Sequence, residues 1–545
     1  MKIFRNFFFQ TVVFALTVVL MQSCSCNGNA DLEAKLKAVA SDSTQVLMVG
    51  NFDRLFDQTG IKVDGDQVQL PEYLINTINN TLASSTRQNI NFAIKDLRGI
   101  KYNNFVVAIK LPDTDKQQLA AMPSVAMVFS VSDEGDLEKS LAKIDPGVSS
   151  EKLNGYRLIG TRRFQIAVKD KLGYAVFAGG NPLTGANVVE AIEGWNKQAE
   201  EAPLSSWKKD FLCSDKVYNL IVGTGWFFEN MAKVNPMYSP DFLKTQGLEA
   251  VADGFATFSA NLDDQTAQLV VSMLDKDGKE VKNPYAGKFN TDMMKYASAG
   301  NVLAFSTAIN HAGYEAQAKA LNEVFDGMKS QAGMFSYVVP MLENIFKGLT
   351  DFTTKYMSDG GFFLTAGFAD DATLVKLARP SADDFRIVLT ADLLKDKAAE
   401  GYDYICNKVG EAMKTATRTS SESNGMKVTT FSTREITDYD FRTEQDVYST
   451  FNINVALDGN ILVVSNTAVA KSNECPFDKK LFENSAASAQ LVINKKTPVL
   501  SMLGLPFGVD ATLQTKQSTA TLEVKVTDTD KHVLEAVLGF LVGSL

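Results

Sequence analysis

Histidine is nearly absent from this sequence, which has only His311 and His532 among its 545 residues. So few imidazoles argue against a histidine-based metal site and against a Ser-His-Asp hydrolase. A basic surface is lacking as well, because 64 acidic side chains outnumber 54 basic ones and leave a formal net charge of −10. This balance argues against nucleic acid as a partner.

Cysteines are few, and long apolar runs are missing beyond the N-terminal segment. None of the five cysteines is part of a C-x-x-C arrangement, so we expect no zinc site. We expect Cys213, Cys406 and Cys475 to be unpaired thiols, with a disulfide between two of them as the alternative. After residue 23, no segment reaches the roughly 18 uninterrupted apolar residues that a membrane-spanning helix needs. The composition, 45% hydrophobic and 22% charged, is that of an ordinary globular protein.

The N-terminal segment has the pattern of a secretory signal. Lys2 and Arg5 precede a mostly apolar run over residues 7–21. Such a run is long enough to engage the export machinery but too short to span a bilayer comfortably. The pattern therefore predicts export from the cytoplasm.

The apolar run ends at Gln22-Ser23-Cys24, which resembles the lipobox of bacterial lipoproteins. The resemblance implies that residues 1–23 are removed as a signal peptide and that the Cys24 thiol is acylated. Residues 24–39 would then form the lipidated end and its tether, and two or three acyl chains would make membrane attachment effectively permanent. The alternative is ordinary cleavage near Ser23 or Ser25 without lipidation, and Cys26 is a weaker acceptor.

The remainder of the sequence repeats its strand and helix signals in one order. The apolar run at residues 46–49 has a counterpart at residues 302–305, 256 positions later. Each is followed by a helical pattern, by further strands and by hairpins that open at turns such as Asn154-Gly155 and Asp458-Gly459. A strand at residues 125–131 leads through Asp133 into a helical pattern, where the carboxylate can cap the helix, and residues 385–389 lead similarly through Asp392.

We therefore expect an α+β fold of two tandem related domains, at residues 40–285 and 296–545. Interspersed hairpins favour largely antiparallel, twisted sheets, with helices packed on one face. The alternative is that any two α+β domains would share this much order.

A search for catalytic and metal-binding motifs yields only weak candidates, so we predict no catalytic residue, no metal ligand and no cofactor. The S-x-x-K spacings lack the S-D-N and K-T-G motifs of penicillin-recognising enzymes. The Asp-Gly segments lack the full set of calcium ligands and are typical of tight turns. Each His is expected in a turn or helix cap. The candidates are Ser140 with Lys143, Ser205 with Lys208, Asp64 with Asp66, Asp275 with Asp277, His311 and His532.

Aromatic residues gather near two strand ends, at residues 226–228 and 361–363. A ring platform for sugars or peptides is one interpretation, and buried core is the expected one.

The leader, the strand at residues 46–53, the segment ending at Gly60-Ile61 and the repeated organisation together resemble uncharacterised envelope lipoproteins of Bacteroides-type anaerobes, a family of unknown function. The resemblance implies envelope anchoring and transfers no catalytic residue. In such bacteria an acidic run after the lipidated cysteine tends to mark surface export, and residues 25–30 lack one. We therefore expect an outer-membrane lipoprotein on the periplasmic face rather than the cell surface.

The functional hypothesis is a membrane-anchored lipoprotein with a non-catalytic binding or scaffolding role. Its expected partners are membrane lipid, through acylated Cys24, and an envelope protein or glycan. One alternative is a carboxylate-dependent glycan hydrolase, because a pair of acidic residues leaves no sequence motif. The other is a glycan-binding lipoprotein, which would require an exposed flat patch of Trp or Tyr.

Overall fold

The computed structural model describes residues 29–64, 67–69, 71–72, 98–112, 123–179, 181–234, 249–330, 338–368, 384–423, 425–440, 445–494, 506–530, 532–533 and 536. The chain forms two compact units. Unit 1 comprises Met1–Lys233, Ala250–Lys279 and Asp530–Leu545, and unit 2 comprises Val234–Glu249 and Glu280–Thr529.

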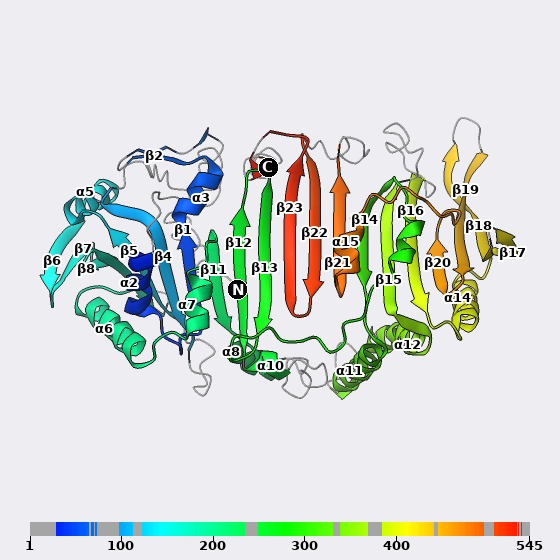
Figure 1. Ribbon diagram of the computed structural model, residues 1–545, viewed down its shortest axis with the longest axis horizontal. Helices are drawn as coiled ribbons and strands as arrows, with labels where there is room; N and C mark the ends of the chain where they lie inside the picture. The colour runs from blue at the N-terminus through cyan, green and yellow to red at the C-terminus, as the bar shows by residue number, and fades with distance from the viewer. Residues whose placement is uncertain are drawn as a thin grey trace. The chain divides into compact units, whose positions relative to one another are not determined.

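Antiparallel pairing connects the strands of unit 1 in the order β6-β7-β8-β9-β5-β4-β1-β11-β12-β13. Figure 1 shows these strands with helices on both sides of them. The elements up to residue 274 are α2 (Asn29–Val39), β1 (Val46–Asn51), α3 (Phe52–Thr59), β2 (Lys62–Asp64), β3 (Gln67–Gln69), β4 (Ile100–Lys110), β5 (Ser124–Val131), α5 (Glu134–Ile144), β6 (Ser149–Leu153), β7 (Tyr156–Gly160), β8 (Gln165–Lys169), β9 (Leu172–Ala178), β10 (Asn181–Pro182), α6 (Ala186–Glu201), α7 (Ser206–Leu212), β11 (Tyr218–Gly223), α8 (Thr224–Val234), α10 (Glu249–Ala252), β12 (Phe255–Leu262) and β13 (Thr266–Leu274).

Unit 2 connects its strands in the order β17-β18-β19-β20-β16-β15-β14-β21-β22-β23, again in antiparallel pairs. Its elements are η3 (Thr291–Tyr296), β14 (Asn301–Thr307), α11 (His311–Ser330), α12 (Val338–Tyr356), β15 (Met357–Phe368), β16 (Phe385–Leu393), α14 (Ala398–Ala412), β17 (Thr417–Ser423), β18 (Met426–Asp440), β19 (Gln445–Asp458), β20 (Ile461–Ser465), α15 (Lys479–Glu483), β21 (Ala487–Ile493), β22 (Gly508–Lys516) and β23 (Thr519–Thr527).

The two strand orders are the same when the ten strands of each unit are numbered along the chain. Leaving out β2, β3 and the two-residue β10, both units read 4-5-6-7-3-2-1-8-9-10. The first strand of each unit, β1 or β14, therefore lies between its second and its eighth.

The predicted fold class, α+β with two tandem domains and helices packed on one face, is wrong. Antiparallel sheet dominates the described chain, with 21 strands in sheet pairings besides the small β2–β3 hairpin. The units are not consecutive stretches of sequence either, because unit 1 takes in Ala250–Lys279 and unit 2 takes in Val234–Glu249. Local strand and helix signals report neither the extent of a sheet nor how distant segments return to it.

Both faces of the unit 1 sheet are covered around β1 and β5, which explains why residues 125–129 of β5 are all apolar. Leu47 and Val49 of β1 belong to a core that includes Leu36 of α2 and Ile192 of α6. The intervening Met48 packs against a second core. That core includes residues of α3 and α5, so helices cover opposite faces rather than one.

Unit 2 also has two cores on opposite faces of its sheet. Val463 of β20 packs with Phe363 and with Met293 of η3, whereas Leu462 packs with Tyr402 of α14 and Phe352 of α12. Successive strand residues point to opposite faces, so this change of core from one residue to the next follows from strand geometry.

The turn at Asn154-Gly155 and the cap at Asp133 form as the sequence predicts. Asn154 and Gly155 both have positive φ in the β6–β7 hairpin, as a two-residue turn of this kind requires. Asp133 accepts a hydrogen bond from the backbone N–H of Asp136 at 2.8 Å, which caps α5 as expected. Among the described residues, no helix has both the length and the apolar character needed to cross a membrane.

Candidate functional site

Strands β14, β15 and β16 lie side by side in unit 2 (Figure 1), and they expose apolar side chains while burying polar ones. On β14, Leu303 and Phe305 are exposed, whereas Ala304 and Ser306 are buried. On β16, Ile387 is 51% exposed while Thr390 is fully buried. An antiparallel sheet with one open face ordinarily presents its polar side to water, so this arrangement is inverted.

Strand register places apolar side chains on the same face of six strands, where they are exposed or half-buried. Phe305 lies opposite Leu364, and Leu364 lies opposite Leu389. In the other direction Phe305 lies opposite Ala489, which lies opposite Leu513. Directly opposed residues of an antiparallel pair project from the same face. We call this surface the uncovered apolar face: Leu303 and Phe305 of β14, Leu364, Ala366 and Phe368 of β15, Phe385, Ile387 and Leu389 of β16, Ala489 and Leu491 of β21, Ala511 and Leu513 of β22, and Leu522 and Val524 of β23.

No side chain on the uncovered apolar face carries a charge, a hydrogen-bond donor or an acceptor, because all are Ala, Val, Leu, Ile or Phe. The described residues include eleven exposed large hydrophobic side chains, and seven of them lie on this face, each between 37% and 51% exposed. Single exposed apolar residues are normal on protein surfaces, but a contiguous group of this kind marks an interaction site.

One end of the same sheet face is already covered. Phe362 of β15 packs against the core formed by Phe352 of α12 and Tyr402 of α14. Phe362 also contacts Phe305 of the uncovered apolar face, with ring centroids 5.9 Å apart. The packed core therefore continues directly into the exposed surface.

The reverse side of β22 and β23 is polar. Asp510 and Thr512 alternate with the apolar residues of β22, and Glu523 and Lys525 alternate with those of β23. These strands therefore separate apolar and polar side chains cleanly between their two faces.

Cys24, the predicted lipidation site, lies outside the described residues, as do Cys26 and the rest of the leader. The first described element, α2, begins at Asn29 and is fixed to unit 1 by polar contacts. The buried Lys35 ammonium lies 3.1 Å from an Asp31 carboxylate oxygen and donates to the Asn104 side-chain oxygen at 2.6 Å. Burial raises the pKa of the Asp31 carboxyl, but Lys35 together with donors from Asn103 and Ser130 lowers that pKa to about 2.

The two S-x-x-K candidates make structural contacts. The Ser140 hydroxyl, buried on α5, accepts a hydrogen bond from the backbone N–H of Arg98 at 2.8 Å. Lys143, on the same helix, is exposed. Lys208 is buried on α7, where its ammonium lies 3.0 Å from the Asp42 carboxylate and donates to the Asp42 carbonyl at 2.8 Å. Lys208 therefore binds Asp42, which attaches α7 to the segment before β1.

The acidic turn and histidine candidates also have local roles. Asp275 accepts hydrogen bonds from the backbone N–H groups of Asp277 and Lys279, both at 2.9 Å, which closes the turn after β13. The backbone N–H of His311, at the start of α11, donates to Asp359 at 2.9 Å. The carbonyl of His532 accepts from Ala536. Asp64 ends β2, and Asp66 lies outside the described residues.

The cysteine and aromatic candidates form no common site. Cys213, Cys406 and Cys475 are free thiols, so the alternative disulfide between two of them is absent from the described residues. Trp226 donates from Nε1 to the Pro112 carbonyl at 2.8 Å, and Phe363 is buried in a unit 2 core. Within the described parts of the chain, no group of three or more His, Cys, Asp or Glu side chains is arranged to hold a metal ion.

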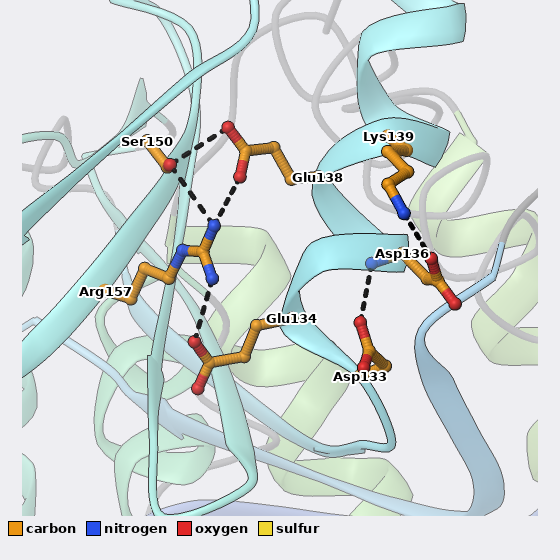
Figure 2. A network of polar contacts seen from close by, with 7 residues as sticks. All are labelled: Asp133, Glu134, Asp136, Glu138, Lys139, Ser150 and Arg157. Carbon is orange, nitrogen blue, oxygen red and sulfur yellow. Dashed lines mark hydrogen bonds and ion pairs between the residues drawn. The ribbon is translucent and has the colours of Figure 1, made fainter.

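Figure 2 shows the acidic cluster on α5, where two carboxylates lie close to one cation. Arg157 of β7 donates to Glu134 at 3.3 Å and to Glu138, which also accepts from the Ser150 hydroxyl at 2.9 Å. Both carboxylates thus bind the same guanidinium, and the contacts fix α5 against the β6–β7 hairpin. This pairing therefore has a structural role.

Asp392 of β16 is another carboxylate relevant to a possible hydrolase, because its side chain is buried. It accepts hydrogen bonds from Asn290 at 2.6 Å, from Asn460 at 2.9 Å and from Ser358. The side chain therefore joins β16 to neighbouring segments, and α14 begins only at Ala398. The expected cap role of Asp392 is wrong for this reason.

Sequence reasoning missed the uncovered apolar face. The alternation of Phe362, Leu364, Ala366 and Phe368 in β15 was available as a signal. Such alternation predicts a strand with one apolar side, but the ordinary interpretation places that side in a core. Only the register and the exposure of the neighbouring strands show that the side remains open.

Comparison with known proteins gives little information. No protein-family description matches the chain, and no curated protein matches it. A solved structure described as crystal form I of TP0453 covers 45% of this chain and 80% of its own, with 10% sequence identity and a TM-score of 0.23. A similarity at that TM-score carries no argument about fold or function.

Proposed function

We propose that this protein is an outer-membrane lipoprotein of the bacterial envelope that binds an apolar ligand on the uncovered apolar face of unit 2. Acylated Cys24 anchors the chain to the periplasmic side of the membrane, and the role of the body is binding rather than catalysis. The observation that carries this proposal is the set of fourteen uncharged apolar side chains in register on six adjacent strands, seven of them exposed and the others half-buried.

Leaving these side chains in water is unfavourable by about 25 cal/mol for each Å² of apolar surface. An apolar ligand gains that free energy on binding, so the inverted face provides both the driving force and the location.

The binding proposal is tested with a fluorescent probe whose emission rises in apolar surroundings. Ile387→Glu places a charge on β16, between Phe385 and Leu389 of the uncovered apolar face, and is expected to weaken probe binding at least about tenfold. Lys525→Gln is the matched control, because it also changes the net charge by −1 but lies on the polar side of β23. Equal affinity in both variants and the natural protein would refute the proposal.

The anchoring part is tested separately in cells. Cys24→Ala is expected to abolish palmitate labelling and to release the chain from its lipid attachment, whereas Cys26→Ala is expected to keep both. Palmitate labelling that persists in Cys24→Ala would show that another residue is the acceptor.

A further inference from the structure

We infer that the occupant of the uncovered apolar face is the acyl chains of a membrane phospholipid. This inference rests on the proposed function and names its ligand. Three properties of the face support it, namely its polarity, its backbone pairing and its dimensions.

The polarity of the face favours hydrocarbon over a protein partner that binds through hydrogen bonds. A protein partner typically makes about one hydrogen bond for each 100–200 Å² of interface and meets a polar rim. None of the side chains of the uncovered apolar face can make a hydrogen bond. An acyl chain needs no such bond and brings no charge that would require a partner.

The backbone beneath the face offers no hydrogen bonds either. Strand β14 is paired on both sides, with β15 and β21, and β15 is paired with β14 and β16. Strand addition by a peptide would require an unpaired edge, so it cannot occur in the middle of this sheet. Contact through side chains alone fits a flexible hydrocarbon chain.

The dimensions also match. Six strands about 4.8 Å apart span roughly 24 Å, and the four-residue distance from Phe385 to Leu389 covers about 14 Å along the strand. Half of the hydrocarbon thickness of a bilayer is about 15 Å, which is the reach of one phospholipid acyl chain. The uncovered apolar face can therefore hold acyl chains lying along or across its strands.

The test uses the full lipidated chain in cells grown with radioactive phosphate. A photoreactive benzoylphenylalanine is placed at Ile387 on the uncovered apolar face, or at the exposed Lys525 on the polar side of β23. The acyl group on Cys24 carries no phosphate, so a radioactive, light-dependent adduct reports phospholipid and not the anchor. Ile387 tolerates a larger side chain because half of it is exposed, and Leu389 provides a second position on the same face.

The expected result is at least about tenfold more phosphate label at Ile387 and Leu389 than at Lys525. No label, or equal label at all positions, would overturn the inference, as would a cross-linked dimer in place of the lipid adduct. If the apolar probe still distinguishes Ile387→Glu from Lys525→Gln while no phosphate label appears, apolar binding stands and the phospholipid assignment fails. If neither experiment distinguishes the two positions, the proposed function fails as well.

Discussion

The buried ammonium of Lys35 lies 3.1 Å from the carboxylate of Asp31, one helical turn earlier in α2. Lys35 also donates to the side-chain oxygens of Asn103 and Asn104 of β4, at 3.0 and 2.6 Å. These contacts join the first described helix to the middle of the unit 1 sheet. If Cys24 carries the proposed lipid anchor, that anchor lies only five positions before Asn29, the first residue of this fixed helix.

Lys35→Met is expected to lower the free energy of unfolding of unit 1 by about 3 kcal/mol, because it leaves buried acceptor oxygens unpaired and removes the nearer of the two cations beside Asp31, the other being Lys101 at 3.8 Å. All three tryptophans, Trp195, Trp207 and Trp226, lie in unit 1, so tryptophan fluorescence during urea unfolding measures this unit. Lys37→Met is the control, since the Lys37 side chain is 75% exposed. Equal losses in the two variants would contradict a special role for the buried cation.

Asp31 gives unit 1 a specific response to acid. Its pKa is about 2 in the folded protein, below the ordinary value of 3.8, so the carboxylate stabilises the fold above pH 3.8. That stabilisation is lost as the pH falls from about 4 to about 2, because protonation removes the partner of Lys35. Allowing for solvent screening of this partly exposed group, the contribution is about 1–2 kcal/mol.

Asp31→Asn is therefore expected to be less stable than the natural protein at pH 5, and the difference is expected to shrink as the pH approaches 2. Urea unfolding followed by tryptophan fluorescence at several pH values in this range measures it. A difference that stays constant with pH would show that the pKa of Asp31 is not depressed by folding.

Local features of this fold were predictable because the responsible residues act on their immediate neighbours. The Asn154-Gly155 turn needs positive φ at two positions, and Asp133 caps α5 through a backbone N–H three residues later. Strand β1, at Val46–Asn51, includes the predicted apolar run. Each of these predictions depends on fewer than about ten consecutive residues.

Features that depend on distant segments were not predictable. Asp392 looked like a helix cap, yet its carboxylate binds Asn290 and Asn460, which are about 100 and 70 positions away. The same limit applies to the candidate site. The pattern of Leu303 and Phe305 predicts one apolar side of a strand, but whether another element covers that side is decided by residues elsewhere in the chain.

Gly361 permits the close approach of β15 to the end of β14. Its φ is +73°, and a Cβ atom at this position would overlap the backbone carbonyl of Thr307. Gly361→Ala is therefore expected to destabilise unit 2 by about 2–4 kcal/mol, from left-handed backbone strain and from overpacking. Calorimetric unfolding measures the loss.

Gly459 supplies the matched control for this substitution. It also has positive φ, +62°, but nothing lies near the position of its Cβ atom. Gly459→Ala is expected to cost only about 1–2 kcal/mol from the backbone conformation. A Gly361→Ala variant as stable as Gly459→Ala would show that β15 can move away from Thr307.

Adjacent residues of β16 allow the two sides of the sheet to be compared directly. Val388 is 3% exposed and packs in a unit 2 core, whereas Ile387 is 51% exposed on the uncovered apolar face. Val388→Ala is expected to lower the free energy of unfolding by about 1.5–3 kcal/mol, and Ile387→Ala by less than about 1 kcal/mol, although it removes more carbon atoms. Calorimetry of the delipidated protein measures both values.

Adding phospholipid should enlarge the effect of Ile387→Ala alone, because a ligand that binds the folded state stabilises the natural protein more than the variant. An Ile387→Ala cost as large as that of Val388→Ala without lipid would mean that the face is already covered by the protein itself.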